Sequence, residues 1–483
     1  MLIFSEMKKN LLLTFGSDNI RPSATAYWLL CGLAALSFLL TLPVQYIGQE
    51  SVYPLMSYEM WFHGEYLTPS MYGVYYWRPP LYNLMIIPVA QLIGWDHMLV
   101  AARIVALTAT ISSALLLAWF VRRLFCNKTF AAFTALIYLT LGDVLFYRGW
   151  LCYSEAVFGL FVLMSIVFGW LALAENRYTY LAVAVLAVSA AFLSKALTAY
   201  VFYVITMIVV AYRQRRWAFL CSWKSLLLNG LALTFPLFWY RIVPAGDYQS
   251  HTMLADITSK LIPVSGGKYI KHVLTYALET LLMLLPVAGV LLYAYMRRQD
   301  LGKWRADPNV ATAMIIALVN YLPYCLSPQS DVRYAFPLLP FIGLTISFLI
   351  FYGAPRVQQW SVKWIIAAIV LKFALGSLGF PFFHQQSRAS FEPVAKDILR
   401  SVGNHHLYAT DMSGSALSIV SRVDRLIYPK APLTWPPAQF NDGFVISYWR
   451  DQDMGIIVKK YAVGQDEVYL RCKGTACPKF PGK

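Results

Sequence analysis

Five charged residues lie at the ends of long apolar segments, where proton transfer and phosphate binding are both chemically available. They are Glu50, Arg78, Glu155, Lys195 and Arg333. A charge at the edge of a hydrocarbon layer is costly unless it is paired or used. Each residue alone has a plain structural explanation, such as an interfacial acid, a snorkelling anchor or a local ion pair. Together, carboxylates beside basic groups suit a site that handles a lipid-linked phosphate and an acceptor hydroxyl.

The residue types suggest a separate role for each group of residues in this site. Glu50 and Glu155 are the candidate catalytic carboxylates, because a carboxylate can take the proton of an attacking hydroxyl. Arg78, Lys195 and Arg333 are the candidate ligands of the donor phosphate. Five neighbours are candidates for positioning the substrates: Gln49, Tyr53, Glu59, Tyr76 and Tyr334. We expect Arg148 to be only an anchor or a partner of Glu155.

The composition identifies the kind of chain that must position these residues. It has 483 residues, of which 59% are hydrophobic and 13% are charged. Soluble chains contain about 25% charged residues, so a soluble enzyme, a disordered chain and a disulfide scaffold are excluded. The composition is typical of a polytopic helical membrane protein. Its net charge of +16 therefore points to cytoplasmic loops and lipid headgroups rather than to nucleic acid.

Apolar runs long enough to cross a bilayer predict about eleven transmembrane helices. The predicted spans are 26–47, 98–121, 129–147, 154–174, 179–194, 197–212, 224–241, 273–296, 311–326, 334–352 and 364–383. The block 179–212 is either two short spans or one kinked span. We interpret the first span as an anchor, because no small-residue cleavage site follows it.

Loop charges predict the orientation of these spans. With the N-terminus inside, most lysines and arginines of the loops lie on the cytoplasmic side, as the positive-inside rule requires. An odd number of spans then places the C-terminal tail outside. All seven histidines also fall on the outer side under this assignment. We therefore expect a multi-pass protein of the cytoplasmic membrane with its chemistry on the outer face.

Two regions lie outside the spans, so we divide the chain into a membrane domain, 1–383, and a tail domain, 384–483. Within the first domain, 48–97 is a long outer loop with two expected interfacial helices, at Tyr53–Trp61 and 81–93. The tail reads as a small extracytoplasmic α/β domain. Its expected helix is Glu392–Arg400, and its expected strands are Leu407–Thr410, Leu426–Tyr428, Phe444–Trp449, Ile456–Val463 and Val468–Cys472.

The cysteines and histidines make limited predictions. Cys472 and Cys477 are expected to form a disulfide, because they lie on the oxidising side and Gly474 permits a tight turn between them. Scattered single histidines do not form a metal motif, so no metal ligand is assigned. No cofactor is predicted with certainty, and a divalent cation stays possible; a chelator would test it.

Several motifs together resemble the GT-C glycosyltransferases. In the first outer loop these are Gln49-Glu50, Glu59-Met60, Gly64-Glu65-Tyr66 and Arg78-Pro79-Pro80-Leu81, followed by "AARI"; later come Glu155, "FLSKA" around Lys195 and "VRYAFPLLP" at 332–340. The pattern is most similar to lipid A aminoarabinose transferases and bacterial relatives of protein O-mannosyltransferases. The matches extend over residues 20–345, and the tail carries no assignable motif.

The resemblance implies a GT-C fold and a function. Such enzymes transfer one sugar from a polyprenyl phosphate to a glycolipid, glycan or protein acceptor on the outer face, and we expect inversion at the anomeric carbon. One position departs from the pattern, because Gln49 replaces the aspartate to which the family's catalytic role is assigned, and glutamine cannot act as a base. Either Glu50 or Glu155 takes that role, or the acceptor differs, or the usual chemistry is lost.

Other functions share some of these features. A glycan polymerase or ligase would use the same outer site with a diphosphate-linked oligosaccharide. A transporter or flippase would place charges at midspan and repeat its halves, whereas Lys372 is the only clear midspan charge and no repeat is visible. The sugar and the acceptor cannot be read from the sequence.

Overall fold

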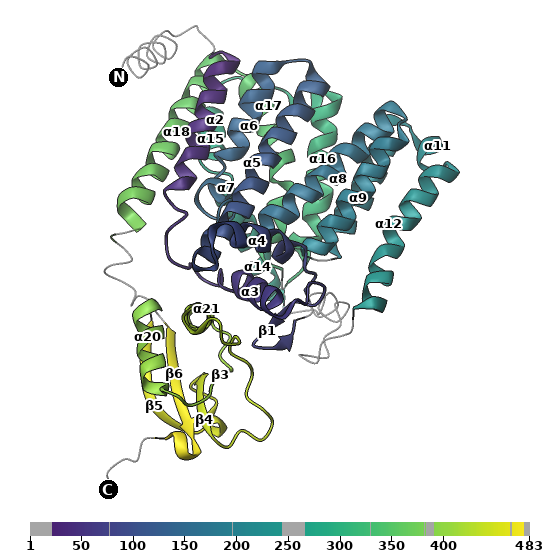
Figure 1. Ribbon diagram of the computed structural model, residues 1–483. Coiled ribbons are helices and arrows are strands. Elements are labelled where there is room, and N and C mark those ends of the chain that lie inside the picture. Colours follow the sequence, from purple (N-terminus) through teal and green to yellow (C-terminus); the bar gives the residue numbers. More distant parts are fainter. Residues whose placement is uncertain are drawn as a thin grey trace.

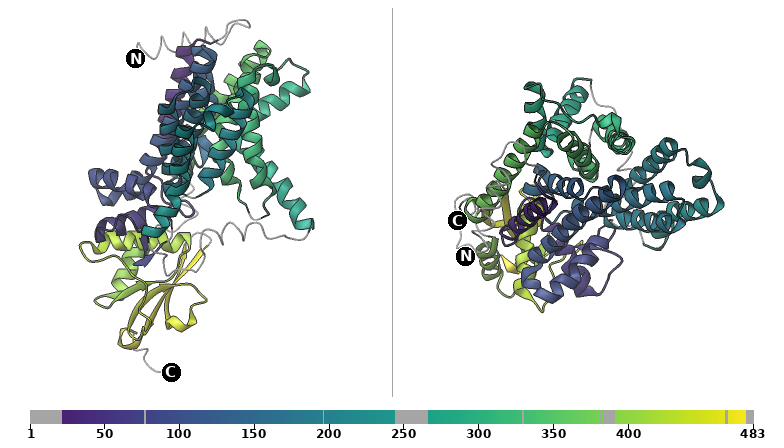
Figure 2. Two further views of the ribbon diagram at one scale, coloured as in Figure 1. Left: turned by 90° about the vertical axis from the view of Figure 1, so that its right-hand side faces the viewer. Right: turned by 90° about the horizontal axis from the view of Figure 1, so that it is seen from above.

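The computed structural model is a helical bundle with a small α/β domain at one end (Figure 1). It describes residues 22–76, 78–195, 197–243, 266–328, 330–380, 382, 391–463 and 466–477. The side view in Figure 2 shows the first outer loop between the bundle and the tail domain. The predicted fold class, a polytopic α-helical membrane protein with a small C-terminal α/β region, is confirmed.

Helices account for all of the predicted spans. The bundle consists of α2 (Ala24–Leu39), α5 (Met98–Phe125), α6 (Lys128–Leu139), α7 (Gly142–Phe146), α8 (Glu155–Glu175), α9 (Tyr178–Ser194), α10 (Thr198–Gln214), α11 (Trp217–Leu220), α12 (Trp223–Ile242), α14 (Gly266–Met283), α15 (Val287–Met296), α16 (Pro308–Leu326), the 3-10 helix η3 (Val332–Leu338), α17 (Leu339–Phe351), α18 (Pro355–Ala374) and the π-helix η4 (Leu375–Gly379). Five helical segments in the described residues are long and apolar enough to cross a membrane, and a bent pair makes a sixth. Five more apolar helices are shorter.

Three predicted spans differ from the observed helices. The first ends at Leu39 rather than at residue 47, because Pro43 lacks the amide hydrogen that a continuing helix needs. The third is broken between α6 and α7. The eighth is split into α14 and α15, which are bent by 100° around Pro286. These breaks expose backbone groups that a straight helix would satisfy internally.

The first outer loop contains both expected helices. They are α3 (Val52–His63) and α4 (Leu81–Ile93), and a small hairpin of β1 (Ser70–Met71) and β2 (Val74–Tyr75) lies between them. The 3-10 helix η1 (Trp95–His97) then leads into α5. The loop is therefore an ordered layer against the end of the bundle (Figure 1).

The tail domain is a four-stranded sheet with two helices. In chain order its elements are α20 (Phe391–Val402), β3 (Leu407–Ala409), α21 (Gly414–Ile427), β4 (Gly443–Ser447), β5 (Ile456–Val463) and β6 (Asp466–Lys473). The strand order is β3-β4-β6-β5, with β3 and β4 parallel and the other pairs antiparallel. The expected strand Leu426–Tyr428 is wrong, because Leu426 and Ile427 end helix α21. Apolar residues of that segment recur at helical spacing, and Ser413 caps its first turn.

Helix α21 fixes the tail domain to the first outer loop. The hydroxyl of Ser418 lies 3.2 Å from that of Ser51, and Ser421 lies 2.7 Å from the hydroxyl of Tyr46. At the start of the helix, a Cβ atom on Gly414 would lie only 2.5 Å from the carbonyl oxygen of Gly48. The contact therefore requires glycine at residue 414. Apolar residues of the loop and the tail form one continuous core around it.

Candidate active site

Glu155 and Lys195 form an ion pair at one end of the bundle. Glu155 begins α8, and Lys195 follows α9, which packs along α8. The Lys195 Nζ atom lies 2.8 Å from Oε1 of Glu155, and both side chains are largely buried, with 15% and 6% of their surfaces exposed. The positive end of the α8 dipole also stabilises a carboxylate at this position. The pair thus neutralises two charges that the sequence places at apolar helix ends.

Arg78 is held next to this pair by two tyrosines. Its Nη1 donates to the Tyr53 hydroxyl at 2.9 Å, and its guanidinium lies 5.7 Å from the Tyr53 ring and 5.3 Å from the Tyr76 ring. The Tyr53 hydroxyl in turn donates to Ser154, the residue before Glu155. Electrostatic attraction to Tyr53 raises the pKa of Arg78 above its usual value. Within the part of the chain that the structure describes, no carboxylate forms an ion pair with Arg78, so its charge is available to an anion.

Arg333 and Tyr334 complete the group from η3. Arg333 is 44% exposed, and its Nε lies 3.6 Å from Oδ2 of Asp331. The Tyr334 ring lies 5.2 Å from the Lys195 Nζ atom. Arg78 and Arg333 are both close enough to Glu155 to interact with its charge. Two carboxylates, Glu155 and Asp331, therefore lie among three cations, which leaves a net positive site suited to an anionic group.

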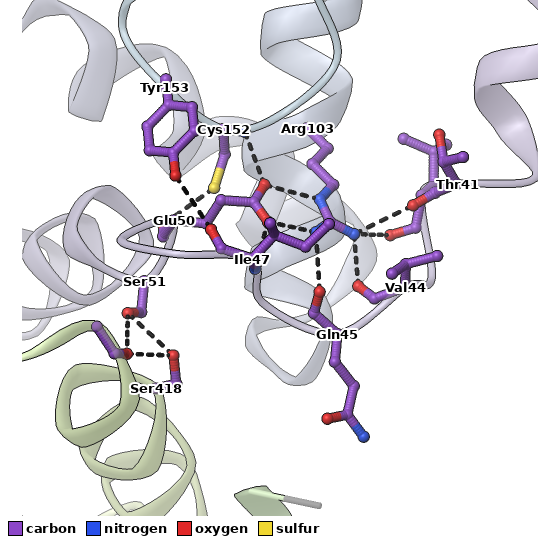
Figure 3. Close-up of polar contacts among 12 residues, drawn as sticks. Thr41, Val44, Gln45, Ile47, Glu50, Ser51, Arg103, Cys152, Tyr153 and Ser418 are labelled. Carbon is purple, nitrogen blue, oxygen red and sulfur yellow. Dashed lines mark hydrogen bonds and ion pairs between the residues drawn. The ribbon is translucent and has the colours of Figure 1, made fainter. Parts of the chain in front are cut away.

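Glu50 lies in a separate, fully buried network (Figure 3). Its two carboxylate oxygens accept hydrogen bonds from the side chain of Arg103 and from the backbone N–H groups of Ile47 and Cys152. The Arg103 side chain is also fully buried. Four donors occupy the carboxylate, so no face of it is open to a substrate. This placement argues against the predicted role of Glu50 as the base.

Arg103 explains why the chain after α2 turns where it does. Its guanidinium donates to the carbonyl oxygens of Thr41, Leu42, Val44 and Gln45 in the turn that follows α2 (Figure 3). Arg103 was not among the sequence candidates. The available signal was a basic residue within the apolar start of α5, but its partner Glu50 is 53 residues away.

The five positioning candidates lie in three different places. Tyr53, Tyr76 and Tyr334 lie around the converging charges. Glu59 is fully buried and accepts hydrogen bonds from the β1–β2 hairpin, so it has no surface for substrate contact. Gln49 is exposed in the turn before α3.

Arg148 was expected to be an anchor or a partner of Glu155, and among the described residues it pairs with other carboxylates instead. Its Nη1 lies 2.7 Å from Oδ1 of Asp143, and its Nη2 lies 3.9 Å from Asp331. Asp143 begins α7, which exists because the third predicted span is broken. The sequence analysis missed Asp143 for the same reason: an unbroken helix would have placed it inside the membrane segment.

The structure also bears on the disulfide and the metal question. The predicted disulfide is present, with the Sγ atoms of Cys472 and Cys477 bonded at 2.04 Å. Among the described residues, no three histidine, cysteine, aspartate or glutamate side chains are grouped as metal ligands. His251 and His384 lie outside the described residues, so cation dependence stays a prediction to be tested.

The bundle, the ordered first outer loop and the small α/β domain define a polytopic helical membrane protein, and this fold is found in solved structures. Two solved structures of ArnT from Cupriavidus metallidurans, one in the apo state and one bound to undecaprenyl phosphate, have this fold. Each superposes with a TM-score of 0.64 at 13% identity over 93% of this chain and 98% of theirs. At this identity the likeness establishes the fold alone.

Sequence comparison finds two curated relatives, both undecaprenyl phosphate-alpha-4-amino-4-deoxy-L-arabinose arabinosyl transferases. The chain is 27% identical over 217 residues to that of Edwardsiella ictaluri (strain 93-146) and 31% identical over 164 residues to transferase 1 of Pseudomonas fluorescens (strain Pf0-1). The matches cover 44% and 32% of this chain but only 39% and 28% of the relatives' lengths. No protein-family model matches the chain.

Proposed function

We propose that this protein is a membrane glycosyltransferase that moves a sugar from a polyprenyl phosphate to an acceptor hydroxyl or phosphate oxygen. The observation that carries the proposal is the convergence of Glu155 with Lys195, Arg78 and Arg333. A net positive site at the end of an apolar bundle suits a phosphate whose lipid tail stays in the bilayer. The names of the two curated relatives, which specify an undecaprenyl-phosphate-linked sugar, support the same donor class.

The proposed reaction is a single displacement at the anomeric carbon. The acceptor oxygen forms the new bond to that carbon, the bond from the carbon to the phosphate oxygen breaks, and polyprenyl phosphate leaves with the bonding electrons. Arg78, Lys195 and Arg333 stabilise the charge that develops on the leaving phosphate. Attack from the opposite face inverts the configuration.

Glu155 replaces Glu50 as our candidate for the base. Its Oε1 is engaged by Lys195, whereas Glu50 has both oxygens occupied by four donors. A hydroxyl acceptor would transfer its proton to the Glu155 carboxylate, and an already ionised phosphate acceptor would need no base. Gln49 is not a candidate for the base, because its amide cannot accept a proton.

The proposed orientation puts this site and the tail domain on the outer face of the cytoplasmic membrane. The loop charges support it, since the loops at the opposite ends of the helices carry most of the lysines and arginines. The N-terminus is then cytoplasmic, and the disulfide of the tail lies in an oxidising compartment.

The test is a transfer assay with purified protein in lipid nanodiscs. A monosaccharide-linked polyprenyl phosphate is supplied with membrane glycolipids, and release of free polyprenyl phosphate is measured with and without acceptor. Acceptor-dependent release supports the proposal. A requirement for a diphosphate-linked oligosaccharide would indicate a polymerase or ligase, and movement of the donor without cleavage would indicate a flippase.

The two ends of α8 provide a matched control for the role of Glu155. Glu155→Gln should lower turnover by about 10²–10⁴-fold if the acceptor is a hydroxyl, the usual contribution of general-base catalysis. Glu175 ends the same helix in a surface ion pair with Arg123, and Glu175→Gln should leave turnover unchanged. Equal turnover in the two variants and the native protein would refute the assignment of the base.

A further inference from the structure

Three fully buried carboxyl groups lie where the tail domain meets the first outer loop. They are Glu59 on α3, Asp424 on α21 and Asp411 before α21. In the described chain, none of the three forms an ion pair with a lysine, arginine or histidine. A buried carboxylate without a cationic partner is costly, and it is usually protonated instead. We therefore expect these carboxyl groups to be protonated while the junction is closed.

Glu59 holds the β1–β2 hairpin. Its Oε1 accepts from the N–H group of Tyr72 at 2.7 Å, and its Oε2 accepts from the hydroxyl of Ser70 at 2.8 Å and from the N–H group of Gly73 at 3.1 Å. Gly73 has a φ angle of +69°, and the turn around it is what points these N–H groups towards Glu59. Glu59 thus determines the shape of the hairpin tip.

The hairpin connects the tail domain to Arg78. On one side, the Tyr72 hydroxyl donates to the Asp411 carbonyl oxygen at 2.7 Å, and the Tyr72 carbonyl oxygen accepts from the N–H group of Trp435 at 2.7 Å. On the other side, β2 leads directly to Tyr76, whose ring contacts the Arg78 guanidinium. A movement of the tail domain would therefore move the segment that places Arg78.

The groups that face the two tail carboxyls are acids, phenols and backbone amides. Asp424 accepts from the N–H group of Leu433 through Oδ1, while its buried Oδ2 has no hydrogen-bond partner among the described residues. The Asp424 carboxyl faces Tyr58, Tyr72 and Glu59. Asp411 accepts from the N–H group of Ser413 and faces Tyr448, Tyr72 and Asp451. The arginines of α21 turn elsewhere: Arg422 packs on Tyr46, and Arg425 pairs with Glu392.

We propose that Glu59 and Asp424 form a proton-dependent latch that holds the tail domain on the hairpin, and that Glu59 is thereby a positioning residue for Arg78. With both groups protonated, the junction buries only neutral carboxyls and stays closed. Loss of either proton leaves an unpaired charge at a closed junction, which favours opening to water. The role at Arg78 rests on the proposed function, whereas the latch itself does not.

The direction of the pH dependence follows from the burial of Glu59. Burial raises the pKa of Glu59 to about 7 and raises that of Asp424 well above its usual range. Because the pKa of Glu59 is higher in the closed state than in the open state, protonated Glu59 stabilises the closed state. This stabilisation is complete below the pKa of an exposed glutamate, about 4.3, and it is lost as the pH rises to about 7. For Glu59 alone, the opening equilibrium should increase by about 50- to 100-fold between pH 5 and pH 8.

The experiment measures opening through a thiol placed inside the junction of the full-length protein in nanodiscs. Ser418 is fully buried against Ser51, so the thiol of a Ser418→Cys variant reacts with iodoacetamide only when the tail separates from the loop. Native Cys126 is exposed and serves as the internal reference. The ratio of the two labelling rates, resolved by mass spectrometry, removes the common effect of pH on thiol reactivity.

We expect this ratio to rise by about 50-fold or more between pH 5 and pH 8. The rise should disappear when Glu59→Gln and Asp424→Asn are added, because an amide has the shape of the protonated acid and does not titrate. Glu65→Gln, on an exposed residue of the same loop, should leave the rise intact. A ratio that does not change with pH, or a rise that persists in the double amide variant, would overturn the latch.

Two further measurements separate the latch from other outcomes. If the double variant aggregates on size exclusion, the single Glu59→Gln variant is used, and its rise should be smaller than that of the native protein by the share of Glu59, about 50- to 100-fold. In the transfer assay, KM for the donor should increase from pH 5 to pH 8 in the native protein but not in the latch variant. Absence of transfer would refute the proposed function and leave the labelling result valid, whereas a normal transferase with pH-independent labelling would refute the latch alone.

Discussion

Replacing Glu50 by glutamine tests whether this residue is structural or catalytic. The side chain keeps its shape, but only one of its two end groups can still accept hydrogen bonds. Of the four donors around Glu50, about half lose their acceptor, and the buried Arg103 loses its counter-charge. Removing one partner of a buried ion pair costs about 3–5 kcal/mol.

We expect a value near the lower end of this range, about 3 kcal/mol, because four carbonyl oxygens continue to accept from Arg103. That free energy corresponds to about a 100-fold larger population of the opened loop. The assay is the midpoint of thermal aggregation in detergent, followed by fluorescence-detected size exclusion. Glu50→Gln should lower this midpoint clearly, while Glu175→Gln, in a surface pair, should not.

A double variant supplies the internal check. Adding Arg103→Met to Glu50→Gln removes the buried guanidinium that has lost its counter-charge. The double variant should therefore be more stable than the summed free-energy changes of the two single variants predict. The reasoning is refuted if Glu50→Gln is as stable as the native protein but turns over 10²–10⁴-fold more slowly, roughly the loss expected of a missing base. That result would return the catalytic role to Glu50.

Three further outcomes follow from the site and its supports. Arg333→Lys keeps the charge but loses the planar fork, so donor KM should rise while expression and thermal stability are unchanged; an unchanged KM would remove Arg333 from the donor site. Gln49→Asp should increase turnover at neutral pH if the exposed turn faces the acceptor, and no change in turnover would show that it does not. Gly414→Val should detach the tail from the loop, because its Cβ would overlap the Gly48 carbonyl oxygen; protease resistance equal to that of native protein would contradict this.

The sequence predicts the parts of the molecule in which one residue type decides the structure. Apolar runs located the helices, and a lysine in apolar surroundings identified Lys195. The alternation of apolar residues located four of the five expected tail strands. The failures depend on partners distant in sequence: Arg103 meets Glu50 across 53 positions, and Asp143 enters the polar region only because α6 and α7 are separate helices.

The roles of the acidic residues show the same limit. Glu50, Glu59 and Glu155 are equivalent by composition and by nearness to helix ends. All three are buried, and their difference is the set of donors that the fold brings to each: four donors at Glu50, three at Glu59, and Lys195 with a backbone N–H at Glu155. Only the three-dimensional structure could therefore show that Glu155, unlike Glu50 and Glu59, lies among the cations of the candidate site.

The network around Arg103 also constrains the order in which the protein can be assembled during synthesis. The turn after α2 leaves the ribosome well before Arg103. The N–H group of Cys152, which also donates to Glu50, is synthesised later still. The first outer loop therefore stays incomplete until α5 and the segment before α8 have been synthesised. Its contacts with Gly414 and Ser418 are added only after all helices of the bundle have been synthesised. A ribosome that stalls before the tail would leave a membrane-inserted chain with an unfinished loop, which surface proteases could recognise and remove.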